Sequence, residues 1–441
     1  MKDLNLKANP VAESSKAQGG SVLVMTLVVM ALLTAMGIAL VTLANSDVEM
    51  NQTDALGKRA FYNAEAGLET ARQALRAANI ASADPYSFDD ELAAAAGDGI
   101  LNLNVPLLQP VYSAGAVASF TGYGNDVPLL NTTPFGRGWY AAFVTNDPAE
   151  AGGVGDMNDT NDRLMITAIG TAPDRVLEVV QAIVERDPFP VPPSTITMLG
   201  PLADFDGGAS AAKDYKGDDC DGVTGHTGVP GLSVPVVGAI GTLSELSAEV
   251  GVQKPDQYTS NGQTGADTVA DVSGSIDPQL ADCDYLLDLA DQVRSVADHI
   301  CSDTASCSPN LLTAATDTVT FCDGDLVLGP GTYRGFLWVT GTLTMNGNSN
   351  FEGVIFVVGE GVYDGDGGGN GSTWGSTLVA DLAGPDNAYG TGDDCTGPVA
   401  GFDRAVYHVA GMGNHDTVYC SELITEAMNG FPLAIRDFRQ R

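Results

Sequence analysis

Residues 21–44 read SVLVMTLVVMALLTAMGIALVTLA, an apolar run without one charged side chain. As an α-helix rising about 1.5 Å per residue, a run of this length spans the roughly 30 Å hydrocarbon core of a membrane. It is longer than the roughly 7–15-residue apolar core of a secretory signal peptide. The sequence therefore predicts a membrane-spanning helix near the start of the chain.

The charges that flank this run predict its orientation. Lys2, Lys7 and Lys16 precede it, and Asp47 and Glu49 follow it. Positively charged flanks tend to stay on the cytoplasmic side of a membrane. We therefore expect a cytoplasmic N-terminus, with the rest of the chain outside.

The helical pattern continues beyond the apolar run, through residues 45–78. Apolar residues recur there at spacings of three or four, which is typical of an amphipathic helix. They are Phe61, Ala64, Leu68, Ala71, Leu75 and Ala78. A single helix over 21–78 is predicted, about 85 Å long, with 21–44 as its membrane-spanning half.

Two short stretches of this region resemble a known family. The sequence QGG at 18–20 is similar to the class III leader of type IV pilins, and RAFYNAEAGL at 59–68 resembles the N-terminal signature of PilX-type pilus assembly proteins. The resemblance implies a leader peptide over 1–20, removed by cleavage between Gly20 and Ser21. A plain signal anchor is the alternative, but the polar break at Gly57 and Lys58 and the amphipathic tail favour the pilin-type helix.

The resemblance also implies where the chain acts. It implies packing of the helix among other pilins, with the protein first in the inner membrane and then in the pilus or at the cell surface. The fifth residue after the cleavage point is Met25, where major pilins carry Glu. That departure favours a rare, minor pilin-like subunit over a bulk filament subunit.

Residues 79–190 are predicted to form a small pilin-like α+β head. Its strand-length segments rich in β-branched or aromatic residues are 139–144, 163–169 and 176–184. Turn-forming residues separate them, so an antiparallel sheet packed on the helix is expected. The stretch from 80 to 130 has no clear period and is interpreted as an irregular connection. Prolines within 187–193 indicate a linker to the next domain.

Residues 191–441 are predicted to form a large Gly- and Asp-rich, mainly-β domain, which makes the fold class α+β. Its short strands alternate with Gly and Asn turns, as in 325–360, and this pattern indicates either a β-solenoid or a tight sandwich. One helix is expected over 279–301, where apolar residues have helical spacing. The Gly-rich run at 339–359 and the closing segment 411–441 also resemble larger PilX-type proteins.

The composition limits the partners and the chemistry. The chain has 20 Lys and Arg against 56 Asp and Glu, a net charge of −36, which repels phosphate backbones and makes nucleic acid an unlikely partner. The four histidines are scattered, and neither a phosphate loop nor a dinucleotide fingerprint occurs. We expect a protein that is not an enzyme.

Acidic loops provide the candidate metal ligands. Ca²⁺ prefers six to eight oxygen ligands, and no other cofactor is expected. Neither loop has the acidic residue at position 12 of an EF-hand, and each is alternatively a solvated turn. The candidate ligands are Asp156, Asn158, Asp159 and Asp162 in one loop, and Asp364, Asp366 and Asn370 in the other.

All seven cysteines follow the membrane-spanning segment, where disulfides persist. An odd number leaves at least one cysteine outside an intramolecular pair, and spacing alone does not fix the connectivity. A short loop closed by Cys301 and Cys307 is one option. The disulfide candidates are Cys220, Cys283, Cys301, Cys307, Cys322 and Cys395.

Three functions are compatible with these features. The leading hypothesis is a minor pilin that primes pilus assembly or occupies the pilus tip. The second is a tip adhesin whose C-terminal domain binds a surface glycan or protein. The third is a type II secretion pseudopilin, which shares the helix but usually carries a smaller head.

Overall fold

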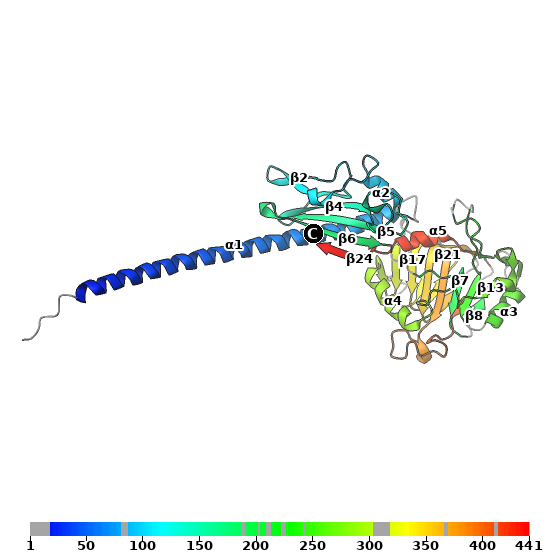
Figure 1. Cartoon of the computed structure of the whole chain (residues 1–441). Helices are drawn as coiled ribbons and strands as arrows, with labels where there is room; N and C mark the ends of the chain where they lie inside the picture. The colour runs from blue at the N-terminus through cyan, green and yellow to red at the C-terminus, as the bar shows by residue number, and fades with distance from the viewer. Residues whose placement is uncertain are drawn as a thin grey trace, which may run out of the picture.

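A long helix carries both folded units of the chain at its C-terminal end (Figure 1). The structure, a computed structural model, describes residues 18–80, 87–186, 190–201, 203–208, 213–221, 226, 228–240, 243–253, 255–302, 318–365, 369–409 and 413–440. The first unit is an α+β head and the second is a larger, mainly-β unit. The predicted fold class is therefore confirmed.

Helix α1 runs from Gln18 to Ile80 without interruption, so the single helix predicted over 21–78 is confirmed. Its N-terminal half contacts no other element, whereas its C-terminal half lies on the sheet of the head (Figure 1). The buried stripe on this half consists of the predicted apolar positions Ala64, Leu68, Ala71 and Leu75.

The head is built on one antiparallel sheet in the order β24-β6-β5-β4-β3. The three predicted strands are present as β4, β5 and β6. The fifth strand, β24, comes from the end of the chain, which therefore returns to the head after forming the second unit. The bounds are β3 Leu130–Phe135, β4 Gly138–Asn146, β5 Arg163–Thr171, β6 Leu177–Glu185 and β24 Ala434–Gln440.

The connection before this sheet is more regular than the sequence predicted. It contains helix α2 (Asp89–Ala95) and an antiparallel hairpin of β1 (Gln109–Ser113) and β2 (Ala116–Thr121). The hairpin turns at Ala114 and Gly115, both at positive φ. Its buried Val117 and Phe120 pack on the face of the sheet away from α1. The expectation of an irregular connection over 80–130 was wrong, because two buried side chains suffice to fix this short hairpin.

The second unit is a β-solenoid, one of the two predicted architectures. Strands that follow one another along the chain alternate between two sheets, and the core strands of both sheets pair in parallel. One sheet contains β15 Thr318–Cys322, β17 Gly331–Val339, β19 Ser349–Gly359, β21 Asn370–Asp381 and β23 Asn414–Val418. The other contains β16 Leu326–Leu328, β18 Thr342–Met345, β20 Val362–Asp364, β22 Val406–His408 and β8 Asp204–Asp206.

The earlier part of the unit stacks on the later part. Strand β7 pairs with β21, β9 pairs with β23, and β8 pairs with β22, so residues near 200 extend the rungs formed near 400. The remaining strands continue or close the larger sheet. They are β7 Ile196–Leu199, β9 Asp214–Lys216, β10 Val237–Ile240, β11 Tyr258–Ser260, β12 Gln263–Thr264, β13 Val269–Asp271 and β14 His299–Cys301.

A column of glycines bends the long strands of the solenoid. Gly335, Gly353 and Gly375 are register partners on β17, β19 and β21, with φ values of +109°, +130° and +131°. A Cβ atom on Gly353 would lie 2.2 Å from the carbonyl oxygen of Gly335. Only glycine fits both this backbone conformation and this close approach.

Stacked aromatic rings fill the interior. The rings of Tyr363 and Tyr407 are 4.5 Å apart, and those of Tyr215 and Tyr258 are 4.7 Å apart, each pair nearly parallel. All four side chains are at most 1% exposed. Because parallel strands place identical positions above one another, one aromatic residue per rung produces such a stack.

Three helices cover the outside of the solenoid: α3 Leu243–Gln253, α4 Cys283–Val296 and α5 Ser421–Asn429. The single helix predicted over 279–301 was too long. Asp282 caps α4 by accepting a hydrogen bond from the backbone N–H of Tyr285, and 299–301 form β14. The pairing of β14 with β15 outweighs the helical periodicity there.

Candidate functional site

The N-terminal half of α1 presents an apolar surface that no part of the described chain covers. Its large apolar side chains between Val22 and Met50 are 47–70% exposed. Residues 22–79 form a helix long and apolar enough to cross a membrane, and its most apolar segment is not buried in the protein. A stripe of this size requires an apolar environment, either lipid or other helices.

The threonine hydroxyls on this half bond to carbonyl oxygens of the helix itself. The hydroxyl groups of Thr26, Thr34 and Thr42 donate to the carbonyl oxygens of Val22, Met30 and Ile38 at 2.9, 2.7 and 3.1 Å. An unsatisfied polar group costs several kcal/mol in hydrocarbon, so these internal bonds suit the helix to a membrane.

Small residues hold the other half of α1 tightly against the head. A Cβ atom on Gly67 would lie 3.0 Å from Cβ of Tyr140, and one on Gly170 would lie 2.1 Å from the carbonyl oxygen of Ala60. The amide of Asn63, buried in this contact, donates to the carbonyl oxygen of Thr171 at 2.7 Å. The block at 59–68 that carries the family resemblance is therefore the segment of closest contact between helix and sheet.

The helix also contacts the end of the chain and the solenoid. The ring of Phe61 packs edge-on against Phe438 of β24, with centroids 6.4 Å apart. Arg76, near the C-terminal end of α1, forms an ion pair of 2.8 Å with Asp298 of the solenoid. The first unit is thus tied to the second by side chains as well as by two chain connections.

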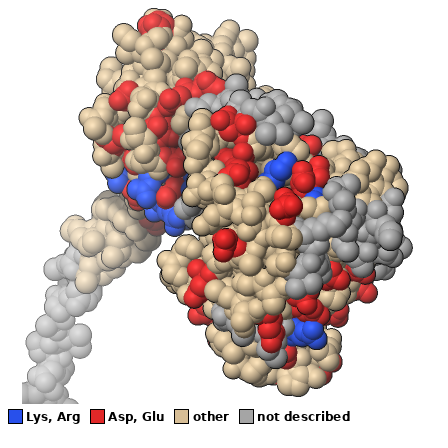
Figure 2. Space-filling model, turned by 90° about the vertical axis from the view of Figure 1, so that its right-hand side faces the viewer, with Lys and Arg blue, Asp and Glu red and all other residues tan. Residues whose placement is uncertain are grey.

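Among the charged side chains, Asp and Glu greatly outnumber Lys and Arg. Figure 2 shows many Asp and Glu and few Lys and Arg on the face that it presents. The basic groups that are described are largely paired, as for Arg334 with Glu352 and Glu426. This distribution matches the net charge of −36.

Among the described residues, two disulfides with both cysteines placed cross-link the solenoid over long stretches of chain. Cys220 pairs with Cys420 across a sequence separation of 200, and Cys283 pairs with Cys395 across 112. Cys420 was not among the predicted candidates, and Cys322, which was, has a buried thiol instead. Cys301 is buried and disulfide-bonded. Cys307 lies outside the described residues, so the predicted Cys301–Cys307 pairing stays a prediction.

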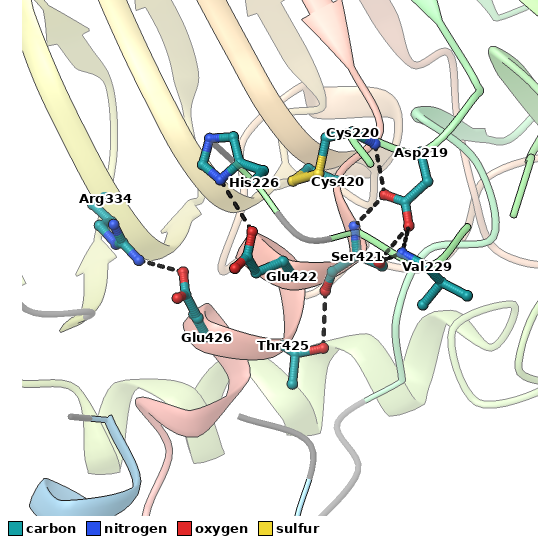
Figure 3. The surroundings of a disulfide bond; sticks show 10 residues. All are labelled: Asp219, Cys220, His226, Val229, Arg334, Cys420, Ser421, Glu422, Thr425 and Glu426. Carbon is teal, nitrogen blue, oxygen red and sulfur yellow. Dashed lines mark hydrogen bonds and ion pairs between the residues drawn. A yellow bond between two sulfur atoms is a disulfide. The ribbon is translucent and has the colours of Figure 1, made fainter. Parts of the chain in front are cut away.

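The first disulfide lies at the start of α5, where one carboxylate joins three chain segments (Figure 3). One oxygen of Asp219 accepts hydrogen bonds from the backbone N–H groups of Cys220 and Ser421, at 2.9 and 2.8 Å. The other accepts from the backbone N–H of Val229 at 2.7 Å. A carboxylate at a helix N-terminus satisfies unpaired N–H groups and suits the helix dipole. No sequence motif indicated this role for Asp219.

Next to this disulfide, α5 contributes two carboxylates that are both paired (Figure 3). His226 lies 3.1 Å from Glu422 and packs on Trp374, and Arg334 pairs with Glu426. Within the described residues, two groups of three side chains lie close enough to share a metal ion, and both include a cysteine of the disulfide. Because a disulfide sulfur is not a thiolate, this cluster is better suited to a structural joint than to a metal centre.

The predicted ligands of the first acidic loop mostly bind their own backbone. Asp156 accepts from the N–H of Asn158 at 3.1 Å, and Asp159 accepts from the N–H of Asn161 at 3.1 Å and, outside the loop, from that of Phe88 at 2.9 Å. Burial raises the pKa of Asp162, although Arg186 lies 3.7 Å away and opposes this. Bonds of this kind order a hairpin loop without a metal. Binding of Ca²⁺ here stays a prediction, which calorimetry at millimolar Ca²⁺ would test.

The second acidic loop is described only in part. Asp364 ends β20 in register with His408, and the backbone N–H of Asn370 donates to the side chain of Asn348 at 2.6 Å. Asp366 lies outside the described residues. Gly20 and Ser21 lie in the first turn of α1, and cleavage between them also stays a prediction.

Comparison with known proteins does not identify the function of this chain. No family model matches the chain, and no match is found among curated proteins. Among solved structures, the chain is similar to the crystal structure of the competence-associated pilin ComZ from Thermus thermophilus. The identity is 13%, the match covers 88% of this chain and 98% of that chain, and the TM-score is 0.21. A likeness this weak carries no argument about function.

Proposed function

We propose that the chain is a minor pilin-like subunit of a type IV pilus system, which joins other pilins through the exposed half of α1. The observation that carries the proposal is the division of one helix into two halves. One half is buried on the head by a stripe of alanines and leucines, and the other is apolar and uncovered by the described residues. A helix built in this way is held in lipid before assembly and packs among similar helices afterwards.

The size of the folded units favours a rare position over a repeating one. The head lies along the C-terminal half of α1, and the solenoid lies past the C-terminal end of the helix and to one side of it (Figure 1). If the chain were repeated along a filament, the filament would have to accommodate its head and solenoid at every subunit. At the pilus tip, or in a complex that primes assembly, they have to be accommodated only once.

Deletion of the chain tests this role in assembly. We expect fewer surface pili and reduced twitching motility in the deletion strain, with recovery when the full chain is supplied in trans. Electron microscopy of surface filaments measures the first effect directly. Unchanged piliation and motility would count against an assembly role.

A tip adhesin is the second candidate function, and it is compatible with the first. The observation that favours it is a groove between the two folded units, lined by both aromatic and polar side chains. If the deletion strain still forms pili but no longer attaches to surfaces, the chain acts in adhesion and not in assembly.

A further inference from the structure

A groove lies where the two units meet. One wall is α4 of the solenoid, and the other is the pair of connections between the units, with Pro190 on the outgoing and Phe431 on the returning segment. The groove encloses about 630 Å³. Ligand sites usually measure about 300–1,000 Å³ and often lie between domains.

The polar lining consists of groups that both donate and accept hydrogen bonds. Gln279, Gln292 and Ser295 line the groove with exposed side chains. Each amide offers two donors and an acceptor oxygen, and a hydroxyl offers both roles. The hydroxyl of Ser295 donates to the backbone carbonyl of Gln292 at 2.7 Å, which leaves its oxygen able to accept.

Apolar rings complete the lining. Tyr285 and Phe431 border the groove, each half-buried, and the ring of Phe431 is held edge-on against Phe336 at 4.9 Å. A ring fixed in this way offers a flat apolar surface beside the amides. A ligand that fits must carry both an apolar face and many hydroxyl-like groups.

The groove is also locally neutral on a strongly acidic protein. Its lining contains one acid, Asp277, and one base, Arg436. Asp277 accepts from the backbone N–H of Gln279 at 2.9 Å, and Arg436 pairs with Glu185. Neither a cation nor an anion finds a net opposite charge here, so a neutral ligand suits the lining best.

We propose that this groove binds a neutral oligosaccharide. Each sugar ring has an apolar face that stacks on an aromatic ring. Its hydroxyls pair with amides, which donate and accept, and with the carboxylate of Asp277, which accepts. Arg436 lies on β24, the edge strand of the head sheet, so a peptide that pairs with this edge is the alternative occupant that the test must distinguish. The inference rests on the proposed location of the solenoid at the outer end of a pilus.

A glycan array tests the proposal with the full chain purified in detergent micelles. We expect binding to a subset of neutral oligosaccharides. The double variant Gln279→Ala/Gln292→Ala should weaken this binding at least tenfold, because it removes both amides. Both positions are exposed, so the fold should be retained. Asp288→Ala is the matched control, since Asp288 is exposed on α4 but does not line the groove.

Three results would overturn the proposal: binding to none of the neutral glycans, binding only to acidic glycans or peptides, or equal binding by the double variant. The same variants separate this inference from the proposed function. Pili that still contain the double variant but no longer attach would support both. If the chain binds the glycan but is never found in pili, glycan binding by the groove is supported and the role as a pilus subunit is rejected.

Discussion

Asp381 is a buried carboxyl group at the end of β21, and it makes the solenoid sensitive to pH. Burial raises its pKa to about 7, and Asp403 and Glu360 add to the rise. The folded state therefore holds a proton that the unfolded state releases near pH 4, so stability falls as the pH rises from about 4 to 7. Over this interval we expect the free energy of unfolding to fall by about 1–3 kcal/mol more for the wild type than for Asp381→Asn, because one pKa unit corresponds to about 1.4 kcal/mol.

Chemical unfolding at pH 4.5 and pH 7.5 measures this difference. The control is Asp288→Asn, which changes an exposed carboxyl on α4. If the control and Asp381→Asn follow the same pH dependence, Asp381 does not hold a proton in the folded state.

Gly353 occupies the middle of the glycine column, where φ is +130°. Gly353→Ala should lower the free energy of unfolding by at least about 2 kcal/mol, because it combines an unfavourable backbone conformation with a collision against Gly335. Gly329→Ala is the control, since a Cβ atom there meets nothing within 4 Å. Equal midpoints of urea unfolding for the two variants would show that the strand bend does not depend on glycine.

At the scale of elements, the Cys220–Cys420 bond ties the start of α5 to a segment 200 residues earlier. Cys220→Ser with Cys420→Ser should lower the free energy of unfolding by about 2–5 kcal/mol, because the unfolded chain regains the freedom of a long loop. Cys322→Ala removes a buried thiol without a cross-link and should cost roughly 1 kcal/mol. Thermal unfolding under non-reducing conditions compares the variants, and an equal loss for both would argue against a stabilising cross-link.

Local patterns explain why the sequence predicted some elements and not others. The spacing of Leu68 and Leu75 and the β-branched runs of β5 and β6 are local signals, so α1 and the head strands were predictable. The pairing of β24 with β6 joins Ile435 to Val184, and nothing near either residue indicates it. The sequence also did not distinguish a solenoid from a sandwich, because the two differ in which strands pair and in what register, and no local pattern specifies this.

The candidate site was predictable to a similar extent. The apolar half of α1 can be predicted from residues 21–44, because length and composition alone define a membrane-spanning segment. The cap formed by Asp219 and the groove beside Gln292 depend on segments that meet only in the folded chain. Asp-rich loops, by contrast, look alike in sequence whether their carboxylates bind a metal ion or accept hydrogen bonds from the backbone of their own loop, as Asp159 does from Asn161.

At the scale of the whole molecule, the exposed half of α1 must be apolar for the chain to enter a membrane or a filament. Leu33→Asp places a charge near the middle of this segment, at a cost of roughly 3 kcal/mol for insertion. We expect the variant to disappear from membrane and pilus fractions. Asn51→Asp adds the same charge to an exposed position beyond the segment and should leave both fractions unchanged. Equal fractionation of the two variants would reject this role of the helix.

Immunogold labelling of sheared pili, with antibodies against the solenoid, tests the pilin role most directly. A minor subunit that joins filaments through α1 should place gold particles on the pili at low density, concentrated at their ends for a tip subunit. The label should vanish in the strain that carries Leu33→Asp. Gold confined to membranes, with bare pili in the wild-type strain, would contradict the proposal that this chain is part of the pilus.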